Sequence, residues 1–433
     1  MIALVQRILG KLNIKVNLSD KLTGDILWNL LSFVLIAING VVLNILILSR
    51  YGSASLGLFN QIYASFIVLS QLAVNGIHFS VLKTISLGGD SRDSSQKFTS
   101  ALTLAAVVSA LVIGLIYPLV NQASRIFDSQ YMTAGIKLVL PGLVFFAMNK
   151  VVLAFLTGQR RMKLFATFQA LRSVFLLVFL LLHIWIIHDG NTVSMIFSLS
   201  EGLLFITLVP ILIKNFCLRF DKTFFQNTAQ HFIFGLQATG GNILLELNTK
   251  VDILILGLFV TDSQVGIYSF AALFIEGFMQ LPTIIRNNIN PILATRYHQS
   301  NRSDFKTFLR SVIRYSYLVF VPLGIVGMLV FPIVGLVKTD VNIQTAWLYF
   351  GIMLAGMLAA SGYLPLLMSF NQAGKPEIQS LVLLCITLVL AVSVLGFTIC
   401  WGTLGAAIGV GFSYVAQAVI IYLFLRKIER SII

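Results

Sequence analysis

The stretch NILILSRYGSASLGLF, residues 44–59, recurs in outline as DILILGLFVTDSQVGIY at residues 252–268. Each copy begins with a polar residue, continues with Ile-Leu-Ile-Leu, passes through a turn and resumes at a glycine followed by apolar residues. The two Ile-Leu-Ile-Leu runs lie 208 residues apart and the two glycines lie 209 residues apart. Because one residue of gap aligns both features, the pattern predicts two related halves of the chain.

A second pair of similar segments lies further along the chain. TGQRR at residues 157–161 and NQAGK at residues 371–375 are both short basic turns that follow an apolar run. Ile-Leu-Ile-Leu is common in membrane helices, so neither pair of segments is sufficient evidence for a repeat by itself. Together the two pairs predict a chain of two halves with six membrane-spanning helices each. Six is an even number, so both halves enter the membrane from the same side, and the repeat is parallel about an axis along the membrane normal.

The composition places the whole chain in a membrane. Of its 433 residues, 58% are hydrophobic and only 11% are charged, against roughly 25% charged residues in an average soluble protein. So few charges cannot cover a water-soluble globule of this size, which excludes a soluble enzyme, a secreted disulfide scaffold and a disordered polymer. The three cysteines show no metal-binding spacing, and no cofactor is expected.

Apolar runs long enough to cross about 30 Å of hydrocarbon recur along the chain. We predict twelve spans, at residues 26–48, 56–82, 98–120, 133–156, 164–187, 193–213, 232–260, 265–292, 310–336, 343–370, 377–400 and 403–425. The predicted fold is an all-α integral membrane protein whose 12 transmembrane helices form two parallel six-helix bundles around a central cavity. Its predicted parts are a cytoplasmic amphipathic segment (1–24), an N-terminal bundle (25–214), a cytoplasmic linker (215–231), a C-terminal bundle (232–425) and a cytoplasmic tail (426–433).

The basic residues are distributed unevenly over the connections. The chain has 30 Lys and Arg against 16 Asp and Glu, an excess that would suggest nucleic acid in a soluble protein. Cytoplasmic loops of membrane proteins gather Lys and Arg, so no nucleic-acid partner is expected. With both termini in the cytoplasm, 21 of the 30 basic residues fall on the cytoplasmic side and 4 on the outer side. Without the polar seventh span the number of crossings would be odd, and one basic terminus would lie on the outer side of the membrane. We therefore keep the seventh span in the prediction.

Three segments resemble a known family. RYGSASLGLFNQIYA (50–64), VTDSQVGIYSFAALF (260–274) and GQRRMK (158–163) are similar to the polysaccharide-transporter branch of the multidrug/oligosaccharidyl-lipid/polysaccharide exporter superfamily. Its Wzx-type members flip O-antigen and capsule repeat units, so the resemblance implies a V-shaped pair of six-helix bundles in the bacterial inner membrane. The implied substrate is an undecaprenyl-pyrophosphate-linked oligosaccharide, moved from the cytoplasmic to the periplasmic leaflet. Membrane lipids and the polysaccharide polymerase machinery are the expected partners.

Nine charged residues within the predicted spans are the candidates for a functional role, since a charge at the bilayer centre costs about 2.5–3.5 kcal/mol on insertion scales. They are Lys150, Arg172, Glu201, Glu246, Lys250, Asp252, Glu276, Arg286 and Arg314. Charges at such depth usually face a cavity or a partner. Given the implied substrate, Arg286 and Lys250 are the first candidates for the pyrophosphate, since a guanidinium can form two parallel hydrogen bonds with a phosphate.

Other polar residues in the spans are further candidates for substrate binding. Lys150 is expected to face the lumen. For Arg172 and Arg314, snorkelling of the side chain to lipid headgroups near a cytoplasmic helix end is the favoured alternative to substrate binding. Asn44 and Gln71 are candidates for hydrogen bonds to sugar, although polar residues of this kind equally often hold helices together.

The sequence contains no G-x-x-x-x-G-K-[ST] motif for ATP. Transport is therefore expected to use an ion gradient, the substrate gradient or downstream consumption. The acids that could couple to an ion are Glu201, Glu246, Asp252 and Glu276. Glu246 and Lys250 are spaced i,i+4, so a packing pair of these two residues is the alternative.

Two rival functions remain at this point. A drug or cation antiporter of the same superfamily predicts a lumen dominated by acids, whereas the nine candidates comprise five basic and four acidic residues. A membrane glycosyltransferase or polymerase generally needs acidic residues in sizeable outer loops, but the outer connections are short and no D-x-D occurs. The protein is therefore expected to be a transporter and not an enzyme.

Overall fold

The computed structural model describes residues 20–88, 91–127, 129–215, 223–299, 302–336 and 342–429. Within these ranges every regular element is helical, which confirms the predicted all-α class. The predicted amphipathic helix of residues 1–24 falls mostly on residues 1–19, which lie outside the described ranges. The same holds for residues 216–222 of the predicted linker and 430–433 of the tail.

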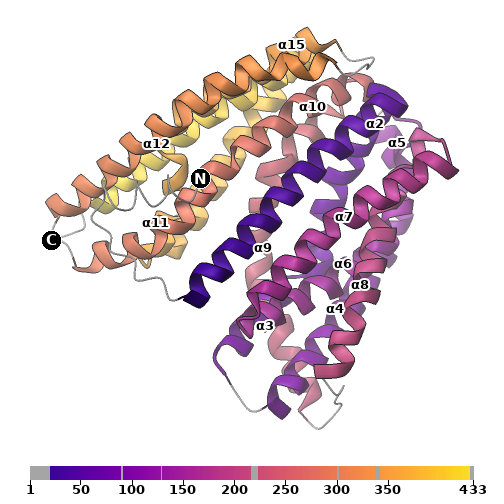
Figure 1. Cartoon of the computed structure of the whole chain (residues 1–433), viewed down its shortest axis with the longest axis vertical. Coiled ribbons are helices and arrows are strands. Elements are labelled where there is room, and N and C mark those ends of the chain that lie inside the picture. Colours follow the sequence, from indigo (N-terminus) through magenta and orange to yellow (C-terminus); the bar gives the residue numbers. More distant parts are fainter. Residues whose placement is uncertain are drawn as a thin grey trace. The chain divides into compact units, whose positions relative to one another are not determined.

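The first compact unit comprises residues 20–266. Its helices are α2 (Asp20–Val74), α3 (Ile77–Ser86), α4 (Ser91–Val120), α5 (Ala123–Ile126), α6 (Met132–Gly158), α7 (Met162–Ile186), η1 (Gly190–Thr192), α8 (Met195–Asn215) and α9 (Phe224–Leu256). Helix α6 lies at the centre of this unit, against α2, α3, α4 and α8 (Figure 1). A helix that is apolar on all sides, as α6 is, fits only such an enclosed position.

The second compact unit comprises the described residues from 267 onward. It contains most of α10 (Asp262–Phe278), then α11 (Gln280–Gln299), α12 (Arg302–Val330), η2 (Phe331–Leu336), α13 (Ile343–Ala360), η3 (Leu364–Leu366), α14 (Ser369–Gln372) and α15 (Pro376–Glu429). Helix α13 packs along α15, and α11 packs against α12 and α14.

Two of the longest helices are bent where the sequence separates two spans. Gly52 interrupts α2 with φ 87°, and Gly402 interrupts α15 with φ 57°. Both angles lie in the left-handed region, which glycine reaches without the steric cost that a Cβ atom imposes. Each bend converts one helix of more than 50 residues into two arms, and these arms match predicted spans 1 and 2 and predicted spans 11 and 12.

Nine helices in the described ranges are long and apolar enough to cross a membrane. The protein is therefore a multi-pass membrane protein, as the composition indicates. The predicted seventh span, α9, is helical from Phe224 to Leu256 but is not among the nine, since glycines and charges interrupt its apolar sequence. The count of twelve spans and the division into two bundles at residues 215–231 stay predictions.

The two glycines of the sequence repeat lie against each other. A methyl group on Gly57 would lie 1.8 Å from the carbonyl oxygen of Asp262, and one on Gly266 would lie 2.0 Å from the carbonyl oxygen of Ser53. The Oγ atoms of Ser53 and Ser263 are 2.7 Å apart. Helix α2 and the first turn of α10 therefore touch backbone to backbone, and only glycine allows this approach. We call this contact the glycine junction.

The side chain of Asp262 holds the glycine junction to two further helices. Its Oδ1 accepts a hydrogen bond from Gln61 Nε2 at 2.7 Å, and its Oδ2 accepts one from Ser129 Oγ at 2.7 Å. Gln61 and Ser129 are both almost completely buried. Hydrogen bonds to a carboxylate are stronger than those between neutral groups. The side chain of Asp262 therefore holds the start of α10 against α2 and against the segment before α6.

Candidate functional site

A buried ion pair lies inside the first unit, between α7 and α8. Arg172 Nε is 2.8 Å from Glu201 Oε1, and Arg172 Nη2 donates a hydrogen bond to Glu201 Oε2 at 3.2 Å. Asn149 on α6 donates to the same carboxylate at 2.8 Å and to the Glu201 carbonyl oxygen at 3.0 Å. Glu201 is only 5% exposed. A charge buried to this degree is tolerated because it is both paired and hydrogen-bonded.

The ring of Phe146 forms a platform for two cations. The Arg172 guanidinium lies 5.0 Å from the centre of this ring, and Lys150 Nζ lies 5.5 Å from it. Phe146, Asn149 and Lys150 are spaced i, i+3 and i+4 on α6, which places them on one face of the helix. Contact with the face of an aromatic ring stabilises a cation without neutralising it.

Lys150 is the cation in this cluster that keeps its charge unpaired. In the described part of the chain it has no ion pair within 4.0 Å and no hydrogen bond, and its ammonium lies over the ring of Phe146. The charges of Arg172, Glu246 and Glu201 act on it from a greater distance. His78 on α3 lies within reach of the Lys150 charge as well. The contacts of the cluster therefore come from α6, α7 and α8.

A column of stacked aromatic rings supports the cluster from α2. Phe59, Tyr63 and Phe66 follow one another at i, i+4 and i+7, and all three stack on Phe197 of α8 at centroid distances of 5.0, 5.1 and 5.6 Å. Phe66 also meets the edge of the Phe146 ring. Lys250 of α9 is 7% exposed and places its Nζ over Tyr63 at 5.2 Å.

The polar face of α9 docks on α2, α3 and α4. Asn242 Nδ2 donates to Gln71 Oε1 at 2.7 Å, and Thr239 Oγ1 donates to Asn75 Oδ1 at 2.9 Å. His231 bonds Ser80 Oγ and the carbonyl oxygen of Lys97. These positions continue along one helical face to Glu246 and Lys250. The hydrogen bonds therefore explain why the two charged residues of α9 face the interior of the first unit.

The structure brings together three of the residues predicted from the sequence, Lys150, Arg172 and Glu201, and the charge of Glu246 on α9 acts on Lys150. Lys250 and the half-buried Asp252 follow on the same helix as Glu246. The snorkelling interpretation of Arg172 is wrong, because its guanidinium is bound to Glu201 within the bundle and not extended to a lipid surface.

Arg286, Glu276 and Arg314 belong to the second unit. Arg286 is half-buried on α11 and donates a hydrogen bond from Nη2 to Thr283 Oγ1 at 3.3 Å, one turn earlier on the same helix. Glu276 is half-buried on α10. Their predicted roles in substrate binding and ion coupling stay predictions.

The amides of Asn44 and Gln71 are used by the helices themselves. Asn44 donates to the Gly40 carbonyl oxygen at 2.8 Å and accepts from Asn60 at 3.3 Å, while Gln71 accepts from Asn242. Both side chains are buried. This favours the helix-packing role that the sequence left open over a role in sugar binding.

Sequence reasoning missed Asn149 and Phe146, which share one helical face with Lys150. It also missed the aromatic column of Phe59, Tyr63 and Phe66, although their i, i+4, i+7 spacing was visible. Spacing alone could not show that Phe197, more than 130 residues later, completes the stack.

Removal of one partner of the Arg172–Glu201 pair is expected to destabilise the protein strongly. Arg172→Met leaves a buried carboxylate without its counter-charge, which costs about 3–5 kcal/mol. The double variant Arg172→Met, Glu201→Met removes both charges and should recover most of that loss. Thermal unfolding in detergent measures both effects, and equal losses in the single and double variants would show that the pair contributes only through its packing.

Comparison with known proteins places the chain in a family. A family model described as "Polysaccharide biosynthesis protein" matches residues 22–295, which span α2 to α11 and include the whole cluster around Lys150. A search of curated proteins finds no match to the sequence.

Solved structures match over nearly the whole chain. The lipid II flippase MurJ in an inward closed conformation is 13% identical with a TM-score of 0.74, over 94% of this chain and 90% of that chain. An inward-facing multidrug resistance MATE family transporter of the MOP superfamily is 15% identical with a TM-score of 0.72, over 92% and 95%. The Vibrio cholerae MATE transporter VcmN in its bent form is 13% identical with a TM-score of 0.60, over 94% and 95%. At these identities the matches show the fold, and together with the family model they establish that the chain belongs to the polysaccharide biosynthesis protein family and has the fold of MOP-superfamily flippases and transporters.

Proposed function

We propose that the protein is a flippase for an undecaprenyl-pyrophosphate-linked oligosaccharide repeat unit, such as that of O-antigen, another lipopolysaccharide component or capsule. It moves the repeat unit from the cytoplasmic to the periplasmic leaflet of the bacterial inner membrane by alternating access, with both chain termini in the cytoplasm. Family membership supports a polysaccharide substrate, and the fold supports transport of a lipid or small molecule. The observation that carries the proposal is the unpaired Lys150 ammonium inside the first unit.

An anionic headgroup would satisfy Lys150. Lys150 is half-buried, and a cation in a membrane-spanning helix without an ion pair is unfavourable, so an evolved site retains it where a ligand supplies the opposite charge. Pyrophosphate offers several oxygens, each able to accept a charge-assisted hydrogen bond. Arg172 already donates to Glu201, so its role is to fix the platform of Phe146. Lys150 supplies the ammonium group for the headgroup, and Lys250 is proposed as a second substrate-binding residue.

Glu246 provides a route to coupling with an ion gradient. Its charge acts on Lys150 when no substrate is bound. Glu201, Asp252 and Glu276 are the other acids proposed for this role.

Deletion of the gene tests the proposed function. We expect loss of surface glycan on a gel together with accumulation of intact single repeat units on the lipid carrier, because the block lies at translocation. Unchanged glycan with new sensitivity to cationic dyes would support the drug antiporter instead. Surface glycan that consists of single, unpolymerised repeat units would support a polymerase.

A further inference from the structure

The connection between α7 and α8, residues 187–194, rests against the bend of α2. A Cβ atom on Gly190 would lie 2.2 Å from Ser55 Oγ and 2.8 Å from the Cβ atom of Tyr51. Only a residue without a side chain allows this approach. The turn of α2 that it touches includes Gly52, whose φ of 87° makes the bend. The connection therefore covers α2 directly at its bend.

A buried histidine joins this connection to α2. His183, on the last turn of α7, is 3% exposed. Its Nδ1 lies 3.0 Å from the Tyr51 hydroxyl, and its Nε2 lies 3.0 Å from Thr192 Oγ1. The rings of Tyr51 and His183 also meet edge to face, with centroids 5.8 Å apart. One imidazole ring thus links α2, α7 and the connection.

The directions of the hydrogen bonds fix the protonation of this ring. The Thr192 hydroxyl donates its single hydrogen to the Asp189 carbonyl oxygen at 3.1 Å, so its Oγ1 accepts from Nε2–H of His183. A neutral imidazole carries only one N–H, which leaves Nδ1 as the acceptor for the Tyr51 hydroxyl. The arrangement is therefore complete for a neutral ring, and a second proton on Nδ1 would remove the acceptor of the Tyr51 hydroxyl.

His183 forms no ion pair in the described part of the chain. The charges that act on it are those of Asp189 and His188 in the connection, and Arg50 acts on the hydroxyl of Tyr51. Among the described residues, α6 and α8 also pack on α7 but place no charged group near enough to act on the ring. A buried imidazolium without a bonded carboxylate is unfavourable. Protonation is therefore opposed while the connection is docked on α2.

We propose that Tyr51, His183 and Thr192 form an acid-sensitive latch that holds the connection on the bend of α2. A proton that binds His183 favours the released connection, because only there is the imidazolium solvated. The latch lies on the predicted outer side, where a fall in external pH reaches it. The turn that it holds also carries Ser53 and Gly57 of the glycine junction, so release removes a support of α2 at that contact.

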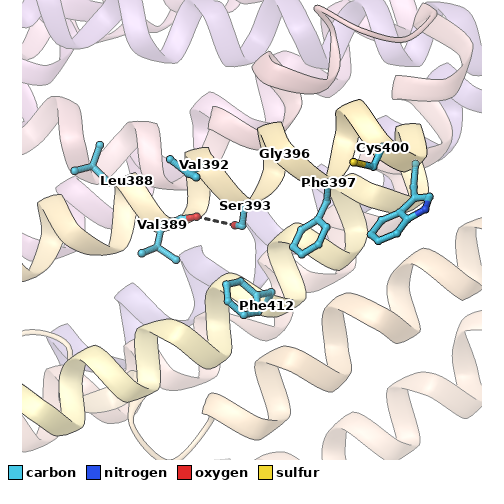
Figure 2. Close-up of a pocket in the computed structure, with 9 residues that line it drawn as sticks. Leu388, Val389, Val392, Ser393, Gly396, Phe397, Cys400 and Phe412 are labelled. Carbon is cyan, nitrogen blue, oxygen red and sulfur yellow. Dashed lines mark hydrogen bonds between the residues drawn. The ribbon is translucent and has the colours of Figure 1, made fainter.

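The other bent helix, α15, has no such latch. Figure 2 shows the pocket beside its bend, whose lining residues include no histidine, tyrosine or acid. Gly402, which makes that bend, has no described atom within 4 Å of the position of a Cβ atom. Acid is therefore expected to act on the bend of α2 and not on the bend of α15.

Cysteine labelling tests the latch without a transport assay. In protein whose three native cysteines are replaced by serine, Ser55→Cys lies under Gly190, whereas Ala54→Cys lies at the exposed neighbouring position. The ratio of their rates of reaction with a maleimide cancels the common effect of pH on the thiols. Free imidazole has a pKa of about 6.5. If only the released state binds the proton, the rate ratio of Ser55→Cys to Ala54→Cys rises roughly tenfold from about pH 7.5 to about pH 5.5.

His183→Gln removes the titration but keeps hydrogen-bonding atoms at this position, so the rate ratio should no longer respond to pH. His188→Asn is the matched control, because His188 is exposed and has a φ of 58°, a conformation that asparagine adopts readily. The response to acid should persist in this control. If His183→Gln does not accumulate, Tyr51→Phe removes one hydroxyl of the latch and should raise the rate ratio already at neutral pH.

Three results would overturn the proposal. The first is a rate ratio that acid leaves unchanged in protein with the latch intact. The second is a response to acid that persists in His183→Gln or is lost equally in His188→Asn. The third is a rate ratio in Tyr51→Phe that equals that of the intact latch at neutral pH. None of these results depends on the substrate, so the proposed function is tested separately.

Discussion

Lys150→Ala is expected to reduce transport of the lipid-linked repeat unit by roughly 30-fold or more while the protein still folds. Loss of one side of a buried, charge-assisted contact costs at least about 2 kcal/mol, which corresponds to that factor. The fold should survive because Lys150 forms no ion pair or hydrogen bond in the described part of the chain. Surface glycan in a complemented deletion strain, normalised to protein abundance, measures the effect.

Lys137→Ala is the matched control for this prediction. Lys137 lies on the same helix, α6, and also places its ammonium over an aromatic ring, that of Tyr117 at 5.4 Å. It lies near the start of α6, more than three helical turns before Lys150 and outside the cluster, so its removal should leave glycan unchanged. Lys150→Arg keeps the charge and should retain part of the activity. Equal glycan from the Lys150→Ala and Lys137→Ala proteins would exclude Lys150 from substrate binding.

Gly57→Ala is expected to lower the stability of the protein although it adds only one methyl group. The added methyl group would lie 1.8 Å from the carbonyl oxygen of Asp262 and 2.7 Å from the Gly266 nitrogen. Both are backbone atoms that cannot rotate away, so α2 and α10 must separate, at a cost of about 1–3 kcal/mol or more. A lower midpoint of thermal unfolding in detergent measures this effect.

Gly40→Ala provides the comparison on the same helix. Gly40 also lies in α2, but no atom lies within 4 Å of its missing side chain. There alanine should be neutral or slightly stabilising, because it is the better helix former. If Gly57→Ala and Gly40→Ala unfolded at the same temperature, the glycine junction would not be the close contact that the structure describes.

The membrane class could be predicted from the sequence because it depends on local pattern. Composition and apolar runs are properties of consecutive residues, and the bends at Gly52 and Gly402 fall between predicted spans. The predicted repeat, which stays a prediction, aligns Gly57 with Gly266. Their direct contact could not be predicted, since alignment of two segments does not show that they touch.

The candidate site was predictable only in part. The cost of burying a charge singled out Lys150, Arg172, Glu201 and Glu246 from the sequence. The partner of each charge depends on tertiary packing, and Arg172 and Glu201 are 29 residues apart on different helices. Helical spacing suggested a partner for Glu246 on α9 itself, whereas the structure also places it within the field of Lys150 on α6.

The packing position of α9 also could not be predicted from the local sequence pattern. By the repeat it is the first helix of the second half, yet it packs on α2, α3 and α4 of the first unit. The reason lies in a series of polar contacts, from His231 to Asn242, that only the folded chain brings together.

Reconstitution tests the central claim most directly. Purified protein in liposomes is given an undecaprenyl-pyrophosphate-linked oligosaccharide, and the fraction of headgroups accessible to an added glycosidase is followed over time. We predict that wild-type protein exposes headgroups from the inner leaflet, that an imposed ion gradient accelerates this, and that Lys150→Ala protein does not exceed protein-free liposomes. Headgroups that stay protected with wild-type protein, in vesicles where the same protein exchanges a cationic dye for protons, would contradict the account.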